Sequence, residues 1–216
     1  MSTTTLTPPI ASSYPVTLSI DYPDRPLNRL TSFFRLFTMI PITIILGLLS
    51  SANLGEHAAR DWQIALSAGG IIFLPLVLML LFRQKYPRWW YDWNLALTKF
   101  SYRVSAYILL LRDEYPSTDD EQAVHIEMPY PDTMKLSRGL PLVKWLLAIP
   151  HYIVLFFLSI AALVCLIIAW FAILFTGRYP RGLFDFIVGV ERWSLRIEAY
   201  TLMLITDQYP PFSLQA

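Results

Sequence analysis

Two stretches of the chain place one acidic residue and two cations at the same spacing. The residues are Asp92, Lys99 and Arg103 in the first stretch, and Asp185, Arg192 and Arg196 in the second. Steps of seven and four residues put the three side chains on one face of a helix. Two cations four residues apart repel each other slightly, so they do not stabilise an isolated helix. The spacing predicts two basic amphipathic helices at a membrane interface, which bind anionic lipid headgroups or an acidic partner.

Each of these stretches follows a motif of a cation, Tyr, Pro and Arg. The motif is Lys85-Tyr86-Pro87-Arg88 before the first stretch and Arg178-Tyr179-Pro180-Arg181 before the second. A Lys or Arg near an anionic membrane surface contributes about 1 kcal/mol of attraction. The candidate lipid- or partner-binding residues are therefore Lys85, Arg88, Lys99, Arg103, Arg178, Arg181, Arg192 and Arg196. A structural motif is expected at Tyr86, Pro87, Asp92, Tyr179, Pro180 and Asp185.

Plainer interpretations of the same charges are generic membrane anchoring, or ion pairing with Asp92, Asp185 or the other stretch. A cluster of aromatic residues directly follows Arg88, and it consists of Trp89, Trp90, Tyr91 and Trp93. Amphipathic rings of this kind gather at the edges of a bilayer, so we interpret the cluster as an interfacial belt. A binding platform is the alternative.

The three histidines, His57, His125 and His151, have no second metal-binding side chain at ligand spacing. We therefore expect no metal and no cofactor, and we interpret His151 as hydrogen-bonded within the bundle, with a haem or metal ligand as the alternative. Cys165 is the only cysteine and lies in an apolar run, which indicates a small buried hydrophobe.

No motif of a serine hydrolase, a phosphate-binding loop, a zinc protease or a dithiol enzyme occurs in the sequence. No carboxylate lies inside an apolar run, and ion-coupled transport usually needs one. The sequence therefore favours a non-enzymatic function, and it predicts no catalytic residues. A substrate site at the membrane interface remains open.

The composition is that of an integral membrane protein, since 55% of the residues are apolar and only 15% are charged. Three apolar runs stand out, Phe33–Leu49, Ile64–Phe82 and Trp145–Phe175. A membrane span needs about 20 apolar residues. The polar segment Ser50–Trp62 separates the first two runs, which predicts a helical hairpin. The third run is too long for one ordinary span and short for two, and no Gly or Asn marks a turn near its middle.

Charge distribution favours two crossings for the third run as well. Arg60 is the only Lys or Arg in a loop between paired runs, so two hairpins place all the others, with Arg35 near the start of the first run, on one side of the membrane. Cations collect on the cytoplasmic side. We therefore predict four membrane segments in an inner (plasma) membrane with both termini cytoplasmic, and a single crossing by residues 145–175 is the alternative.

The chain also contains an internal repeat. Arg35 through Pro41 matches Lys144 through Pro150, and Asp113 through Pro116 matches Asp207 through Pro210. Short strands are expected at Val16–Ile20 and Val124–Met128, where apolar and polar residues alternate, and the two strands could pair. The matched Pro41 and Pro150 are expected to kink membrane helices. The predicted units are a flexible tail (1–13), a first membrane repeat (14–116), an acidic linker (117–123) and a second membrane repeat (124–216).

The assembled blocks resemble a family of bacterial membrane proteins known as domain of unknown function 4389. The resemblance is carried by Leu147 through His151, by the block Phe175-Thr176-Gly177-Arg178-Tyr179-Pro180-Arg181-Gly182, by Asp185, Val190, Trp193, Arg196, Ala199 and Tyr200, by Asp207 and Tyr209 through Phe212, and by Tyr14 through Val16 with Asp21 through Pro23. The first copy departs from the block, with Phe82-Arg83-Gln84-Lys85 at that place. The resemblance implies a membrane location and assigns no activity.

The sequence thus predicts an all-α integral membrane protein of two tandem pseudo-repeats. Each repeat is expected to hold a transmembrane helical hairpin, an interfacial amphipathic helix and a short cytoplasmic β-strand. The expected role is a non-enzymatic scaffold or accessory subunit that docks lipid headgroups or a membrane partner, with a homo-oligomer as another partner and no nucleic acid. The alternative is a small transporter or a lipid-substrate enzyme with its site between the repeats.

Overall fold

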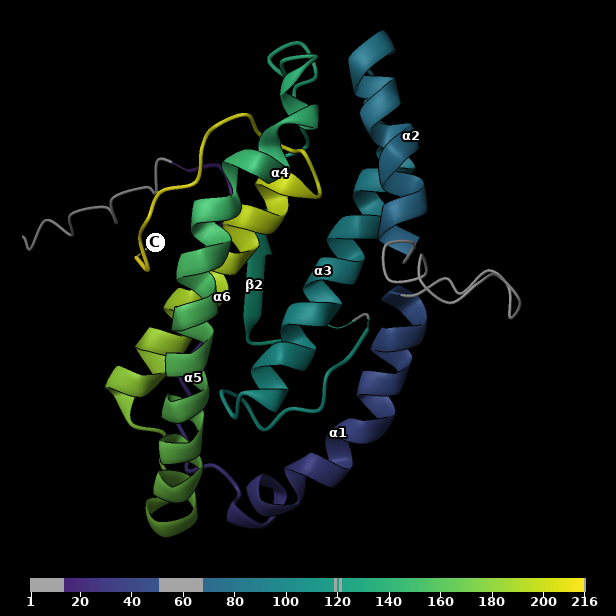
Figure 1. The fold of residues 1–216 in the computed structure, drawn as a ribbon. Coiled ribbons are helices and arrows are strands. Elements are labelled where there is room, and N and C mark those ends of the chain that lie inside the picture. The colour runs from purple at the N-terminus through teal and green to yellow at the C-terminus, as the bar shows by residue number, and fades with distance from the viewer. Residues whose placement is uncertain (1–13, 51–67, 119, 121, 216) are drawn as a thin grey trace, which may run out of the picture.

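The computed structural model describes residues 14–50, 68–118, 120 and 122–215, and the chain is mostly helical (Figure 1). The predicted tail 1–13 and the predicted loop with His57 and Arg60 lie outside these residues. The elements are β1 (Thr17–Ile20), α1 (Arg29–Ser50), α2 (Ala68–Arg83), α3 (Arg88–Ile108), β2 (Val124–Glu127), a 3-10 helix η2 (Leu140–Leu142), α4 (Lys144–Leu147), α5 (Ile149–Thr176) and α6 (Arg181–Thr201).

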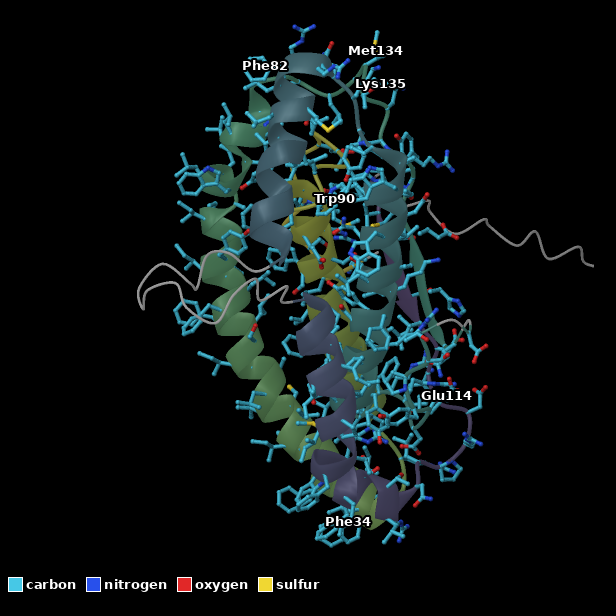
Figure 2. All side chains as sticks on the ribbon, turned by 90° about the vertical axis from the view of Figure 1, so that its right-hand side faces the viewer. Phe34, Phe82, Trp90, Glu114, Met134 and Lys135 are labelled. Atoms are coloured by element: carbon cyan, nitrogen blue, oxygen red, sulfur yellow. The ribbon has the colours of Figure 1, made fainter. Side chains whose placement is uncertain are left out.

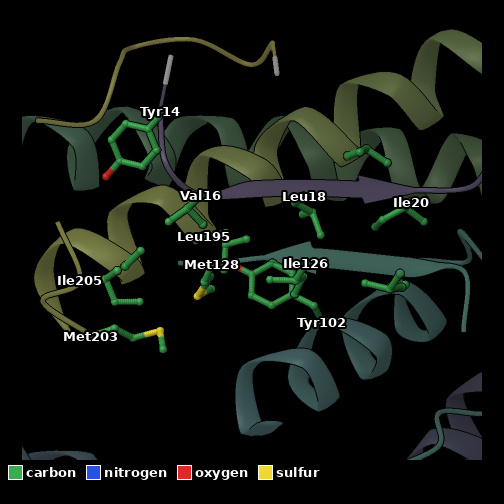
Figure 3. Close-up of a cluster of buried hydrophobic side chains, with 14 of the residues drawn as sticks. Tyr14, Val16, Leu18, Ile20, Tyr102, Ile126, Met128, Leu195, Met203 and Ile205 are labelled. Atoms are coloured by element: carbon green, nitrogen blue, oxygen red, sulfur yellow. The ribbon is translucent and has the colours of Figure 1, made fainter. Parts of the chain in front are cut away.

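The two short strands form where the alternating pattern placed them and pair antiparallel, with Leu18 opposite Ile126. Because side chains alternate along a strand, Leu18 and Ile126 are buried while Ser19 and His125 face outward. β1 packs on α6 and β2 packs on α3. Figure 3 shows the resulting core, to which β1 contributes Leu18, β2 contributes Ile126 and α6 contributes Leu195.

Most of the apolar run of the second half forms one helix, so the predicted hairpin is wrong there. α5 continues for 28 residues from Ile149 to Thr176, because no residue in the run favours a turn. Gly177 ends the helix with a φ of 72°, which glycine adopts at little cost. Pro150 lies in the first turn of α5, where proline is tolerated, so it begins the helix instead of kinking its interior.

The hairpin predicted for the first half is also wrong. α1 and α2 lie one after the other along the long axis of the molecule in both views (Figures 1 and 2). α1 packs on α3 and α5, whereas α2 packs beside η2. A polar segment between two apolar runs shows that the chain leaves the apolar layer, but it does not require the chain to turn back. α1 bends by 56° between Arg35 and Phe37, and Pro41 blocks the backbone hydrogen bond to Phe37 four residues earlier.

Within the described residues, α5 is the one helix long and apolar enough to cross a membrane, and α1 adds a second if its two bent parts count as one span. The predicted fold of two transmembrane hairpins with multi-pass topology is therefore wrong, although the helical class is right. Only 11% of the residues in the most apolar stretch of α5 are buried. Phe156 and Phe157 are both more than half exposed. α5 therefore differs from the core helix of a water-soluble protein, which is buried on most sides.

The molecule has three layers. The sheet covers one side of α3 and α6, and α1 and α5 cover the other side. In Figure 2, α5 lies at one edge and α3 toward the other, and α1 appears between them. The amphipathic helices thus lie between a polar sheet and an apolar helical layer.

Candidate lipid-binding cations and buried charge sites

The eight predicted cations divide into two groups. Lys85, Arg88, Arg178 and Arg181, which flank the Tyr-Pro pairs, are exposed. Those within the helices are half-buried or buried, and they are Lys99, Arg103, Arg192 and Arg196. The division follows from the start of each helix. Pro87 and Pro180 are extended, so the chain reaches α3 and α6 from outside and leaves the flanking cations at the surface.

The first arginine of each amphipathic helix has the same surroundings in both halves. Arg88 pairs with Asp92 at 3.9 Å, and its guanidinium lies 5.2 Å from the Tyr130 ring. Arg181 pairs with Asp185 at 3.8 Å and lies 4.7 Å from the Tyr22 ring. Exposed ion pairs contribute about 0–1 kcal/mol, so neither guanidinium is tightly held by its carboxylate. Both arginines can therefore accept a competing anion.

Tyr86 and Tyr179 hold the Tyr-Pro turns in place. The Tyr86 hydroxyl donates to the carbonyl of Met203 at 2.6 Å, and the Tyr179 hydroxyl donates to that of Leu109 at 3.4 Å. Their own carbonyls accept hydrogen bonds from Tyr130 and Tyr22 in turn. Burial raises the pKa of Tyr86 and Tyr179, which keeps both hydroxyls protonated as donors. These contacts fit the structural role predicted for the motif.

The buried arginines bind the backbone that follows each helix. Arg103 donates to the carbonyls of Ser117 and Thr118 at 2.9 and 3.2 Å. Arg196 donates to those of Ser213 and Gln215. Half-buried Arg192 also donates to carbonyls, those of Leu18 and Leu214, at 2.9 and 3.1 Å. Such geometry disfavours headgroup binding by Arg103, Arg192 and Arg196. It also explains why Arg192 and Arg196 lie four residues apart, since each binds backbone carbonyls outside the helix.

Lys144 forms a buried ion pair with Asp207, and neither residue is among the candidates predicted from the sequence. Its ammonium nitrogen lies 2.8 Å from a carboxylate oxygen of Asp207, and the Lys144 side chain is only 1% exposed. It also donates to the carbonyl of Thr206 at 2.7 Å and lies 4.9 Å from the Tyr200 ring. Lys144 therefore does not extend toward a membrane surface.

Arg35 has the equivalent surroundings in the first half. Its guanidinium pairs with Asp113, donates to the carbonyls of Tyr107 and Arg112 at 2.9 Å, and lies 4.4 Å from the Tyr107 ring. A sequence signal for both pairs existed. The matched repeat blocks contain a cation at Arg35 and Lys144 and an aspartate at Asp113 and Asp207.

His151 is fully buried in an aromatic box. Its Nδ1 accepts a hydrogen bond from the Trp193 indole at 3.1 Å, and its ring stacks on Phe212 at 3.9 Å between centroids. This arrangement fits a histidine bonded within the bundle. Across the part of the chain that the structure describes, no three His, Cys, Asp or Glu side chains are grouped to hold a metal ion.

The aromatic cluster after Arg88 is split between surface and core. Trp89 and Trp93 are more than half exposed. Trp90 and Tyr91 are buried, and the Tyr91 hydroxyl donates to the carbonyl of Met128. Only Trp89 and Trp93 are therefore available for the predicted interfacial belt.

Polar groups also meet between α5 and α6. A cavity of about 220 Å³ is lined by Ser159 and Leu163 of α5 and by Glu191 and Ser194 of α6. Burial raises the pKa of Glu191 to about 7, and the neighbouring Glu198 carboxylate adds to the effect. Glu198, also shielded from water, has a raised pKa as well. A carboxyl that titrates near neutral pH thus faces the most apolar helix.

We expect Glu191→Gln to stabilise the protein at pH 8 and to have no effect near pH 4. The folded-state pKa of about 7 lies above the ordinary Glu value, so the folded state binds the extra proton between these values. Stability from Glu191 is complete at low pH and is lost as the pH rises through 7. Thermal unfolding in neutral detergent at both pH values measures the effect, on the order of 1–3 kcal/mol. A variant no more stable than the wild type at pH 8 contradicts the assignment.

Comparison with known proteins gives one family match. Residues 141–213 match the family described as Domain of unknown function (DUF4389). No curated protein and no solved structure shows significant similarity to the chain. The matched residues contain the Lys144–Asp207 pair, the His151 box, α5 and α6. A bacterial source, which the resemblance implied, stays a prediction. On this match, the segment from Pro141 to Ser213 belongs to the family described as Domain of unknown function (DUF4389).

Proposed function

We propose that the protein is a non-enzymatic membrane scaffold or accessory subunit that lies along one leaflet of a bilayer and docks anionic lipid headgroups. The carrying observation is an apolar layer of exposed helices with exposed cations beside the Tyr-Pro turns. Phe34 and Phe37 of α1, like Phe156 and Phe157 of α5, expose about half of their surface or more. A surface this apolar favours lipid over water.

Dimensions support an orientation along the leaflet. A helix with its side chains is about 10–12 Å thick, and the hydrocarbon of one leaflet is about half of 30 Å. The layer of α1 and α5 therefore fits within one leaflet. In that position α3 and α6 lie at headgroup depth and the sheet faces water.

A crossing along the long axis is disfavoured by the outer face of the sheet. The strands lie about halfway along the molecule (Figure 1), and His125 and Glu127 are exposed there. A crossing would place both near the bilayer centre, where charged groups are costly. When the molecule lies flat, the same residues contact water.

The cations near both ends of the molecule also support the flat orientation. Lys85 follows the end of α2, near the tip where Figure 2 labels Phe82 and Lys135. Arg178 follows the end of α5, at the opposite tip (Figure 1). A flat molecule brings both groups to the same headgroup layer, whereas a crossing separates them across the membrane.

We also propose that the two halves are copies of one unit, joined across the sheet. Matched contacts support a duplication. Tyr22 of the first half donates to the carbonyl of Tyr179 in the second, and Tyr130 of the second half donates to that of Tyr86 in the first. Two headgroup sites of similar design follow from this arrangement.

Neutralising the four exposed cations should remove most of the stabilisation by anionic lipid. Each contributes about 1 kcal/mol near an anionic surface. We expect phosphatidylglycerol, added to protein in neutral detergent, to raise the melting temperature of the wild type more than phosphatidylcholine does. The variant Lys85→Ala/Arg88→Ala/Arg178→Ala/Arg181→Ala should lose at least half of that difference.

The control for this experiment removes cations elsewhere. Lys135 and Arg138 are exposed and lie outside the Tyr-Pro motifs. Lys135→Ala/Arg138→Ala is compared with Arg178→Ala/Arg181→Ala, because each pair removes two charges. Equal losses in the two double variants indicate attraction by overall charge alone, and they refute a specific docking site.

The cavity between α5 and α6 favours the second candidate, a small transporter or lipid-substrate enzyme. It combines a carboxyl that titrates near pH 7 with the hydroxyls of Ser159 and Ser194. General acid-base chemistry uses a carboxyl with such a pKa. This candidate requires that Glu191→Gln abolish a transport or turnover activity while the protein stays folded.

A further inference from the structure

A second cavity, of about 420 Å³, lies where α1 bends against α5. Its walls are mostly apolar and include Met39 of α1 and Leu166, Ile167, Trp170 and Phe171 of α5. The Trp170 indole donates to the carbonyl of Ser32 at 3.2 Å, which fixes one wall to α1. The volume is within the range of small-molecule sites.

Two polar side chains line this cavity and lack partners for one atom each. Ser32 is 2% exposed and Arg35 is 3% exposed. The Ser32 hydroxyl oxygen and the Arg35 Nε are buried, with no hydrogen-bond partner within the described residues. Leaving a buried donor unpaired is costly, and native proteins rarely do so. Ser32 and Arg35 therefore each bring one unpaired buried donor to the wall of this cavity.

The charge of the site selects the kind of acceptor. The Nη2 atom of Arg35 already pairs with Asp113, and its Nη1 donates to two carbonyls. The positive charge is therefore compensated, so an anion would bring an unpaired charge into a mainly apolar cavity. A neutral carbonyl oxygen is the acceptor that satisfies both donors without that cost.

The position of the cavity supplies the rest of the ligand. Ile167 and Phe171 line the cavity and are each about half exposed on α5, so the cavity meets the apolar surface of the molecule. We propose that this cavity binds the acyl chain of a neutral ester lipid, with the ester carbonyl at Ser32 and Arg35. The site rests on the proposed membrane location but not on headgroup docking.

Two probes that differ in one carbonyl test the proposal. Native mass spectrometry of the full chain in neutral detergent measures binding of 1-monooleoylglycerol, an ester, and of 1-O-oleylglycerol, the ether without the carbonyl. We expect the wild type to bind the ester about tenfold more tightly, as the loss of hydrogen bonds to buried donors implies. Ser32→Ala should reduce this preference several-fold, and Leu166→Trp should reduce binding of both probes by filling the cavity.

The control is Ser101→Ala, which removes a hydroxyl from α3 outside this cavity and should leave the preference unchanged. Equal affinity of the wild type for ester and ether overturns the proposal, as does an unchanged preference in Ser32→Ala. Both probes are uncharged. A failure of anionic lipid docking therefore leaves the ratio intact, and a failure here leaves the docking result intact.

Discussion

Lys144→Met is expected to lower the free energy of unfolding by about 3–5 kcal/mol. The Lys144 side chain is 1% exposed and that of Asp207 is 19% exposed, so removing the cation leaves a largely buried carboxylate without its counter-charge. Because a buried ion pair barely repays its desolvation, the penalty arises from the stranded partner. Unfolding in mixed micelles, followed by tryptophan fluorescence, measures the loss.

Two further variants separate the buried pair from general charge effects. Lys144→Met/Asp207→Leu removes both charges and should recover most of the lost stability. Lys135 pairs with Asp132 at 3.4 Å, but their side chains are 84% and 54% exposed. Lys135→Met should therefore change stability by less than about 1 kcal/mol. Similar losses for Lys135→Met and Lys144→Met would contradict the account.

Leu195→Ala should cost about 2–5 kcal/mol, as deletions of large buried side chains do. Leu195 is 1% exposed and belongs to the core cluster that joins α6 to both strands (Figure 3). Since that cluster contains residues of both halves, the variant should unfold in one transition with a lower midpoint. The same unfolding assay measures the change.

The matched control is Leu163→Ala on α5, where the side chain is 57% exposed. This change removes the same atoms from an exposed surface, so stability should stay within about 1 kcal/mol of the wild type. A large loss of stability for Leu163→Ala and a small loss for Leu195→Ala would contradict the placement of the core between α6 and the two strands.

Local signals in the sequence were reliable where the physics is local. Alternation at Leu18 and Ile126 predicted two strands, and charged residues at steps of seven and four predicted α6. The Tyr-Pro motifs mark where α3 and α6 begin. Each of these features depends on residues a few positions apart.

The prediction of membrane hairpins was wrong because the direction that the chain takes after an apolar run is not encoded locally. Apolar runs and a polar insertion say which residues avoid water, but the path of the chain is set by packing on distant elements. Arg35 and Lys144 show the same limit. Each was visible in a repeat block, but its burial depends on an aspartate more than sixty residues away. The division of the eight cations into exposed and buried groups likewise depends on which backbone carbonyls accept hydrogen bonds from Arg103 and Arg196.

The orientation along one leaflet is tested most directly by labelling two single cysteines. With Cys165→Ala as background, Met134→Cys and Asp24→Cys place exposed thiols near the two ends of the long axis. Sealed vesicles of known orientation are treated with a membrane-impermeant maleimide. The account predicts that both positions are labelled from the same side of the membrane. Labelling of Met134→Cys from one side and Asp24→Cys from the other would mean that α5 crosses the bilayer, and it would contradict the account.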